Sequence, residues 1–215
     1  GDSEGVSRCA ESRGDLERAL QFTRSPERKV NLLIKLKKFF EARELVPGLN
    51  SPDKYFNLIK EKAYELLQVK IKSRDFIGAI ELTDFAEIET DGKNKILSHG
   101  RKYIHSRLAD ATSKEDIESI CREEIQFEEK AGNYKTAGIL AEEKLKDLNL
   151  ASILFEKANL FNKAIDTTLD QSKSDKDEYD IKIRLAELNE KGGNLLKAAK
   201  LFESVGNFDK AYLSK

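Results

Sequence analysis

The chain has 215 residues, of which 39% are hydrophobic and 36% are charged, and its formal net charge is −1 at pH 7. This length permits one elongated domain or two compact ones, and so rich a charge content is typical of a thin molecule with a large surface for its volume. Residues 1–108 carry a charge of about +4 and the remainder about −5, without the clustered Lys and Arg of a nucleic-acid-binding domain, so nucleic acid is not an expected partner.

The helix boundaries are indicated first by proline. Pro26, Pro47 and Pro52 all lie between stretches with helical apolar periodicity, where proline ends one helix or opens the next. No period-2 alternation is flanked by hairpin turns, which argues against a β-sheet core. The sequence therefore predicts an all-α fold.

Residues 1–50 are expected to form N-terminal helical repeats. Within them, Lys35, Lys37 and Lys38 precede a pair of phenylalanines, a combination that suits an anionic partner or a membrane surface. The apolar residues at 32–34 and 36 instead favour a core helix whose lysines extend their charged ends to solvent. We favour the core helix and keep the three lysines as candidate binding residues.

Residues 51–131 are expected to form a middle section of longer helices. One helix should run from Asp53 to about Lys72 after the start signal Ser51-Pro52. Its apolar stripe is expected to consist of Phe56, Ile59, Ala63, Leu66 and Leu67. A second should follow Ser113, which opens a capping-box-like sequence, and end near residue 130 before Gly132.

Two carboxylates, Glu124 and Glu128, fall within the apolar face of this second helix. That face is expected to be formed by Ile117, Ile120, Cys121, Ile125 and Phe127. If the chain turns back near Ala111 as an antiparallel hairpin, Glu124 should lie near His99 and Glu128 near Lys95. A buried carboxylate must be paired or reach water. We interpret both as interhelical ion pairs or a solvated edge, and leave open a ligand or partner contact that would include His99.

A short unit recurs along the chain, and such repetition is the main indication of architecture. A polar turn is followed by an aromatic residue or Leu and, three residues later, by Ala. Glycine in the turn tolerates the left-handed backbone, and Asn or Asp can cap the next helix. The aromatic residue is expected to fill the wedge between helices, and alanine allows close helix crossing. The copies are Gly14-Asp15-Leu16 with Ala19, Arg74-Asp75-Phe76 with Ala79, Gly132-Asn133-Tyr134 with Ala137, Asn159-Leu160-Phe161 with Ala164, Gly193-Asn194-Leu195 with Ala198, Gly206-Asn207-Phe208 with Ala211, and more weakly Phe39 with Ala42.

Residues 132–215, with KAGNYKTA at 130–137 and LFESVGNFDKA at 201–211, resemble tetratricopeptide-like helical repeats. The irregular spacing is most similar to the repeats of trafficking and ciliary-transport adaptors and of bacterial sensor modules. The resemblance implies an α-solenoid of stacked short antiparallel helix pairs, in one continuous array with the preceding sections. Each end of the sequence falls within a repeat unit, so we expect the chain to be a fragment of a longer one.

No catalytic or cofactor motif is expected. His99 and His105 are six residues apart and do not share a helix face, as two metal ligands would. There is no glycine-rich phosphate loop with Lys-Ser/Thr and no His-Glu-x-x-His. We expect neither an enzyme nor a bound metal or cofactor.

The expected function is a protein–protein interaction scaffold that binds a partner peptide or domain on a solenoid face. The alternative is a sensor or regulatory repeat domain of a larger signalling or NTPase protein. Cys9 and Cys121 are far apart, no signal-peptide pattern opens the chain, and no run of about 18 apolar residues occurs. We therefore expect a reducing, cytoplasmic location, with membrane association only through a larger complex.

Overall fold

The computed structural model of the chain describes residues 2–172 and 178–213. These residues form fourteen α-helices, one 3-10 helix and one π-helix, and they form no β-strand. The predicted all-α class, built from consecutively packed helix pairs, is confirmed. Of the helices in the described ranges, none is both long and apolar enough to cross a membrane.

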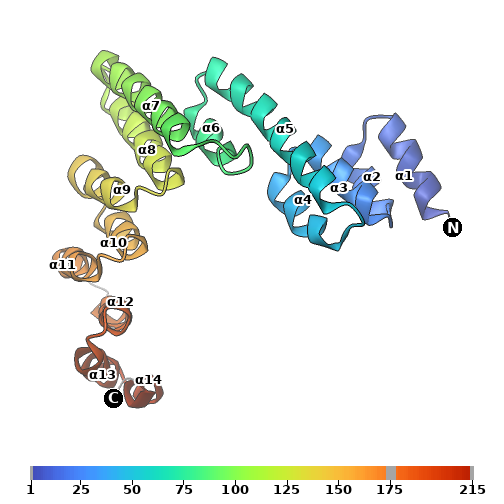
Figure 1. Ribbon diagram of the computed structural model, residues 1–215. Coiled ribbons are helices and arrows are strands. Elements are labelled where there is room, and N and C mark those ends of the chain that lie inside the picture. Colours follow the sequence, from blue (N-terminus) through green and yellow to red (C-terminus); the bar gives the residue numbers. More distant parts are fainter. Residues whose placement is uncertain (1, 173–177, 214–215) are drawn as a thin grey trace. The chain divides into compact units, whose positions relative to one another are not determined.

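The chain divides into two compact units, residues 1–100 and 101–215. In the first unit, α1 packs on α2, α3 on α4, and α5 on α6, as Figure 1 shows. The sections predicted from the sequence, with boundaries after residues 50 and 131, stay a prediction. The elements of this unit are α1 (Ser3–Ser12), α2 (Leu16–Phe22), α3 (Pro26–Lys35), α4 (Phe39–Leu45), η1 (Val46–Gly48), α5 (Pro52–Lys72), α6 (Phe76–Leu82) and the first half of α7 (Thr90–Asp110).

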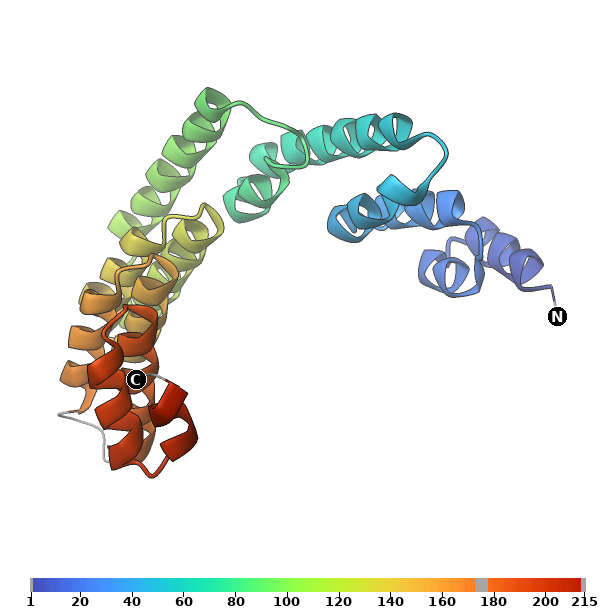
Figure 2. The same cartoon turned by 60° about the horizontal axis from the view of Figure 1, so that its bottom comes forward.

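In the second unit, each helix from α8 onward packs against the next one along the chain. Figure 2 shows the same succession with the bottom of Figure 1 brought forward. The elements after α7 are α8 (Lys114–Lys130), α9 (Tyr134–Leu140), η2 (Ala141–Leu145), α10 (Leu148–Lys157), α11 (Phe161–Ser172), α12 (Glu178–Lys191), α13 (Leu195–Ser204) and α14 (Phe208–Leu213). The predicted helices after Ser51-Pro52 and after Ser113 are thus confirmed, and Ser113 Oγ accepts the Asp116 N–H at 3.0 Å.

The repeated turn is a three-residue connection between antiparallel helices whose middle residue is left-handed. At Gly132, φ is +80°, and the Asn133 N–H after it donates to the Glu128 carbonyl at 2.8 Å, so a free carbonyl at the helix end is satisfied. Glycine is not required, because Lys37 adopts the same conformation at φ +61°. The middle residues of these connections are Gly14, Lys37, Arg74, Gly132, Asn159, Gly193 and Gly206.

The alanine of each unit lies at a buried helix crossing. All seven predicted alanines, together with Ala151 after the left-handed Lys146, are no more than 2% exposed. Where α1 crosses α2, Ser7 Oγ donates to the Ala19 carbonyl at 2.7 Å, and where α10 crosses α11, Ser152 Oγ donates to the Ala164 carbonyl at 3.3 Å. A larger side chain than alanine would hold these backbones apart.

Two details of the predicted unit need correction. Asp75 caps the next helix by accepting the Gly78 N–H at 2.9 Å, but Asn133 and Asn194 make no such bond. The aromatic residue does not always fill the wedge between helices, since Phe39 is buried but Phe208 is 68% exposed. The constant parts of the unit are the left-handed residue and the alanine.

Candidate functional site

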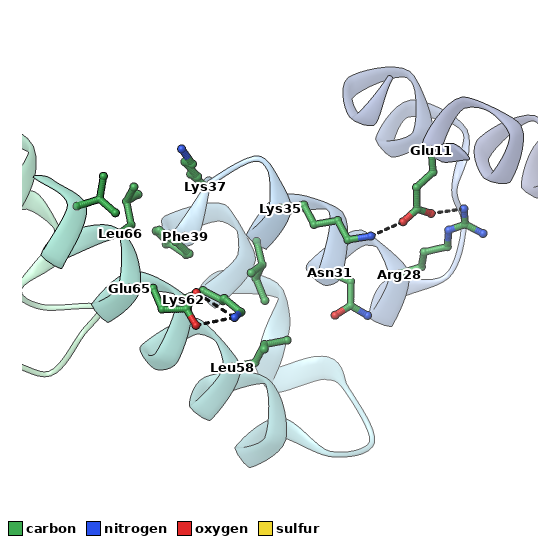
Figure 3. Close-up of a pocket in the computed structure, with 12 residues that line it drawn as sticks. Glu11, Arg28, Asn31, Lys35, Lys37, Phe39, Leu58, Lys62, Glu65 and Leu66 are labelled. Atoms are coloured by element: carbon green, nitrogen blue, oxygen red, sulfur yellow. Dashed lines mark hydrogen bonds and ion pairs between the residues drawn. The ribbon is translucent and has the colours of Figure 1, made fainter. Parts of the chain in front are cut away.

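An open pocket with a volume of about 600 Å³ lies among α1, α3, α4 and α5, within residues 1–100. Figure 3 shows the residues that line it. Three of the lining helices, α1, α3 and α5, are each the first helix of a packed pair, and the three pairs follow one another along the chain. We call this pocket the α3–α5 groove. Its apolar lining is Ile34, Phe39, Leu58, Leu66 and Val69, and its polar lining is described below.

The apolar floor is partly open to solvent. Ile34 and Phe39 are buried, Leu58 and Leu66 are half-buried, and Val69 is 58% exposed. The three apolar α5 residues of the groove lie to one side of the stripe formed by Ile59, Ala63 and Leu67, which are buried in the unit. Helix α5 thus presents apolar residues on a second side, which the described chain covers only in part.

One wall of the groove is held by an ion-pair cluster centred on Glu11 (Figure 3). Its two oxygens accept hydrogen bonds from Arg28 Nη2 at 2.7 Å and from Lys35 Nζ at 2.6 Å. The hydrogen bond from Lys35 lowers the pKa of the Glu11 carboxyl, against the effect of burial, and the charge of Arg28 lowers it further. Glu11 is therefore ionised at neutral pH and ties α1 to α3.

The opposite wall carries a second pair, on α5. Lys62 Nζ lies 2.8 Å from Glu65 Oε1 and 3.2 Å from Glu61 Oε1. The hydrogen bond to Glu65 is the main reason that the pKa of Lys62 is raised, and Glu61 acts in the same direction. Both walls thus have charged rims above an apolar floor.

The three candidate lysines separate in the structure. Lys35 and Lys37 line the groove, and Lys37 is also the left-handed residue between α3 and α4. Lys38 lies at the start of α4, where its Nζ is 3.0 Å from Glu17 Oε1 on α2. The residues at 32–34 beside them are buried, as expected of a core helix. Binding by these lysines stays a prediction.

The two buried carboxylates of α8 both pair with α7, in an antiparallel hairpin. Glu124 Oε1 lies 2.8 Å from His105 Nε2, which makes an ion pair when His105 is protonated. Glu128 accepts two hydrogen bonds from Arg101, at 2.6 and 2.8 Å, and a third from Asn133 Nδ2 at 2.7 Å. This geometry is that of structural ion pairs between helices.

The predicted partners of these carboxylates, His99 and Lys95, are wrong by six residues. Residues 114–119 at the start of α8 are all exposed, including Ile117, which the sequence placed on the apolar face. The first residue of α8 to be buried is Ile120, so this helix begins beyond the end of α7 and then returns along it. His99 itself is exposed, and the histidine that pairs with Glu124 is His105.

Sequence reasoning missed most of the groove. The stripe predicted on the helix after Ser51-Pro52 includes Leu66 among its core positions, but Leu58 and Val69 are additional apolar residues beside that stripe. A helix with apolar residues over more than one face was the available signal. Glu11 and Arg28 carried no local signal, because their proximity arises only when α1 packs near α3.

No protein-family model matches the sequence, and no curated protein matches it. The class of the protein is defined by its fold alone, which is all-α with consecutively packed helix pairs.

Among residues 2–172 and 178–213, no group of three or more His, Cys, Asp or Glu side chains is placed to hold a metal ion. Cys9 is exposed and Cys121 is buried, and both are free thiols.

Proposed function

We propose that this chain is a protein–protein interaction scaffold that binds a segment of a partner protein in the α3–α5 groove. The observation that carries the proposal is an open apolar floor between the first helices of successive pairs, with charged residues along both rims. Apolar anchors in a groove provide affinity, while charges at the rim provide specificity. The free thiols Cys9 and Cys121 are compatible with a reducing, cytoplasmic location.

Val69 and Tyr64 form a matched pair for testing this proposal. They are 58% and 49% exposed on the same helix, so replacing either removes no buried contact of the core, but only Val69 lines the groove. A photo-crosslinking amino acid at each position, in the full chain incubated with an extract of its own cells, should capture a defined protein from position 69 alone.

The captured protein would then be purified and its affinity measured by titration calorimetry. Val69→Glu should weaken binding at least tenfold, which corresponds to about 1.4 kcal/mol, and Tyr64→Glu should leave the affinity unchanged. Equal crosslinking from both positions, no crosslinked protein, or equal affinities of the two variants would contradict the proposal.

A further inference from the structure

The charges of the α3–α5 groove do not balance. Four cations line it, Arg28, Lys35, Lys37 and Lys62, against two lining carboxylates, Glu11 and Glu65. Glu4 and Glu61, which lie outside the lining, also pair with Arg28 and Lys62. The Lys37 side chain makes no hydrogen bond or ion pair among the described residues, and the buried Arg28 Nε–H donates to no described atom. The lining therefore has a net positive charge, and among the described residues Lys37 is the lining cation that no carboxylate pairs with.

The groove offers an occupant's backbone few hydrogen-bond partners. Its walls are helices, whose N–H and C=O groups are satisfied internally. Most polar side chains at its rims are paired with each other, as in Lys35–Glu11 and Lys62–Glu65. An extended peptide on this floor would leave backbone groups unsatisfied, whereas a helix satisfies its own.

The groove is long enough for a short helix. Leu58, Lys62, Glu65, Leu66 and Val69 follow one another at steps of four, three, one and three residues, which places them along one side of α5. At 1.5 Å per residue, the stretch from Leu58 to Val69 extends for about 16 Å, or three helical turns. An occupant of three to four turns matches this length.

We propose that the occupant is an amphipathic helix of a partner protein whose apolar stripe is flanked by Asp and Glu. This inference rests on the proposed function and specifies the chemistry of the partner. The apolar stripe covers Leu58, Leu66 and Val69, and the flanking carboxylates pair with Lys37 and with the cations of the two rims. Such a segment presents apolar residues at spacings of three and four, with net negative charge.

The test is a display selection of random helix-forming peptides of about 14 residues against the full chain. Enriched peptides should carry net negative charge and an i, i+3 or i+4, i+7 apolar stripe. Each would be synthesised, and its binding measured by fluorescence anisotropy and circular dichroism. Peptide helicity should rise on binding, and affinity should fall at least tenfold as salt increases from about 50 to 500 mM, because the rim attraction is screened.

Matched variants locate the binding. Val69→Glu and Lys35→Glu should each weaken it at least tenfold, while Tyr64→Glu and Lys54→Glu, on the same unit but outside the groove, should leave it unchanged. Circular dichroism and thermal unfolding of all four variants would show that the fold is retained.

The outcomes separate this inference from the proposed function. Peptides that bind the groove but are basic, or that remain extended when bound, would contradict the inference that the occupant is an acidic helix. They would not contradict the proposed scaffold function. Failure to enrich any peptide, or binding unaffected by Val69→Glu, would overturn both. Crosslinking from position 69 to a second copy of the chain would also overturn the acidic-helix partner.

Discussion

Glu128 and Arg101 face each other across α8 and α7 through two hydrogen bonds, Nε to Oε1 at 2.6 Å and Nη2 to Oε2 at 2.8 Å. The Glu128 side chain is 2% exposed and that of Arg101 is 41% exposed. The hydrogen bond to Glu128 is the main reason that the pKa of Arg101 is raised. A buried carboxylate therefore links α8 to α7, and Asn133 links it to the next connection.

Glu128→Gln should lower the free energy of unfolding by about 2 kcal/mol, because the amide cannot accept all three hydrogen bonds and loses the charge. The neighbouring Glu129→Gln is the control, since Glu129 makes a half-exposed pair with Lys157 worth about 1 kcal/mol or less. Urea unfolding of both variants measures the difference. Equal losses would show that the Arg101 pair has no special structural role.

Lys146→Gly should stabilise the chain by about 1 kcal/mol, because Lys146 has a left-handed backbone at φ +56° that glycine adopts without a Cβ penalty. The reciprocal change, Gly132→Ala at φ +80°, should destabilise it by a similar amount, although nothing lies within 4 Å of the added Cβ. Lys144→Gly, inside the helical segment η2, should be destabilising and serves as the control. Thermal unfolding of the three variants and the native chain tests this predicted order of stability.

Gly138→Ala should destabilise the α9–α10 packing by about 1–3 kcal/mol, since the new Cβ would lie 2.7 Å from Cε1 of the buried Phe155 ring. Phe155→Leu alone should also be destabilising, because it removes buried ring atoms. In the double variant the clash is relieved, so its loss in unfolding free energy should be smaller than the sum of the two single losses. Additive losses would contradict this close approach.

Stability should fall at acidic pH, partly through Glu156. Burial raises the pKa of this carboxyl, but the hydrogen bond from Lys191 and the ion pair with Arg184 outweigh burial and lower it overall. A group with a lowered folded-state pKa contributes stability above its unfolded pKa and loses that contribution as pH falls through the folded value. The loss should therefore begin below about pH 5 and continue to more acidic pH.

Glu156→Gln isolates this contribution, because glutamine does not titrate. At pH 7 the variant should be less stable by about 1–3 kcal/mol. Its difference from the native chain should shrink as pH falls, measured by urea midpoints between pH 7 and pH 3. A difference independent of pH would show that the ion pairs do not stabilise the folded chain.

Much of the fold followed from local sequence because it depends on neighbouring residues. A left-handed connection needs only the residues that close the preceding helix, so Gly132 and Gly206 were recognisable by type. Lys146 was not, because lysine carries no local signal for this backbone. The alanines were predictable for the same reason as the glycines, since each lies at a fixed distance after its connection.

The candidate site depended on tertiary structure. The sequence indicated that Glu124 and Glu128 would be buried but not their partners, because hairpin register is set by how far α8 extends beyond α7 before the two helices pack. Likewise, Lys35 and Lys37 were recognisable as cations, but only packing brings Lys35 to Glu11 and places both lysines beside the apolar residues of α5. Helical periodicity is a local property of the chain, whereas register and groove geometry are decided by contacts between distant residues.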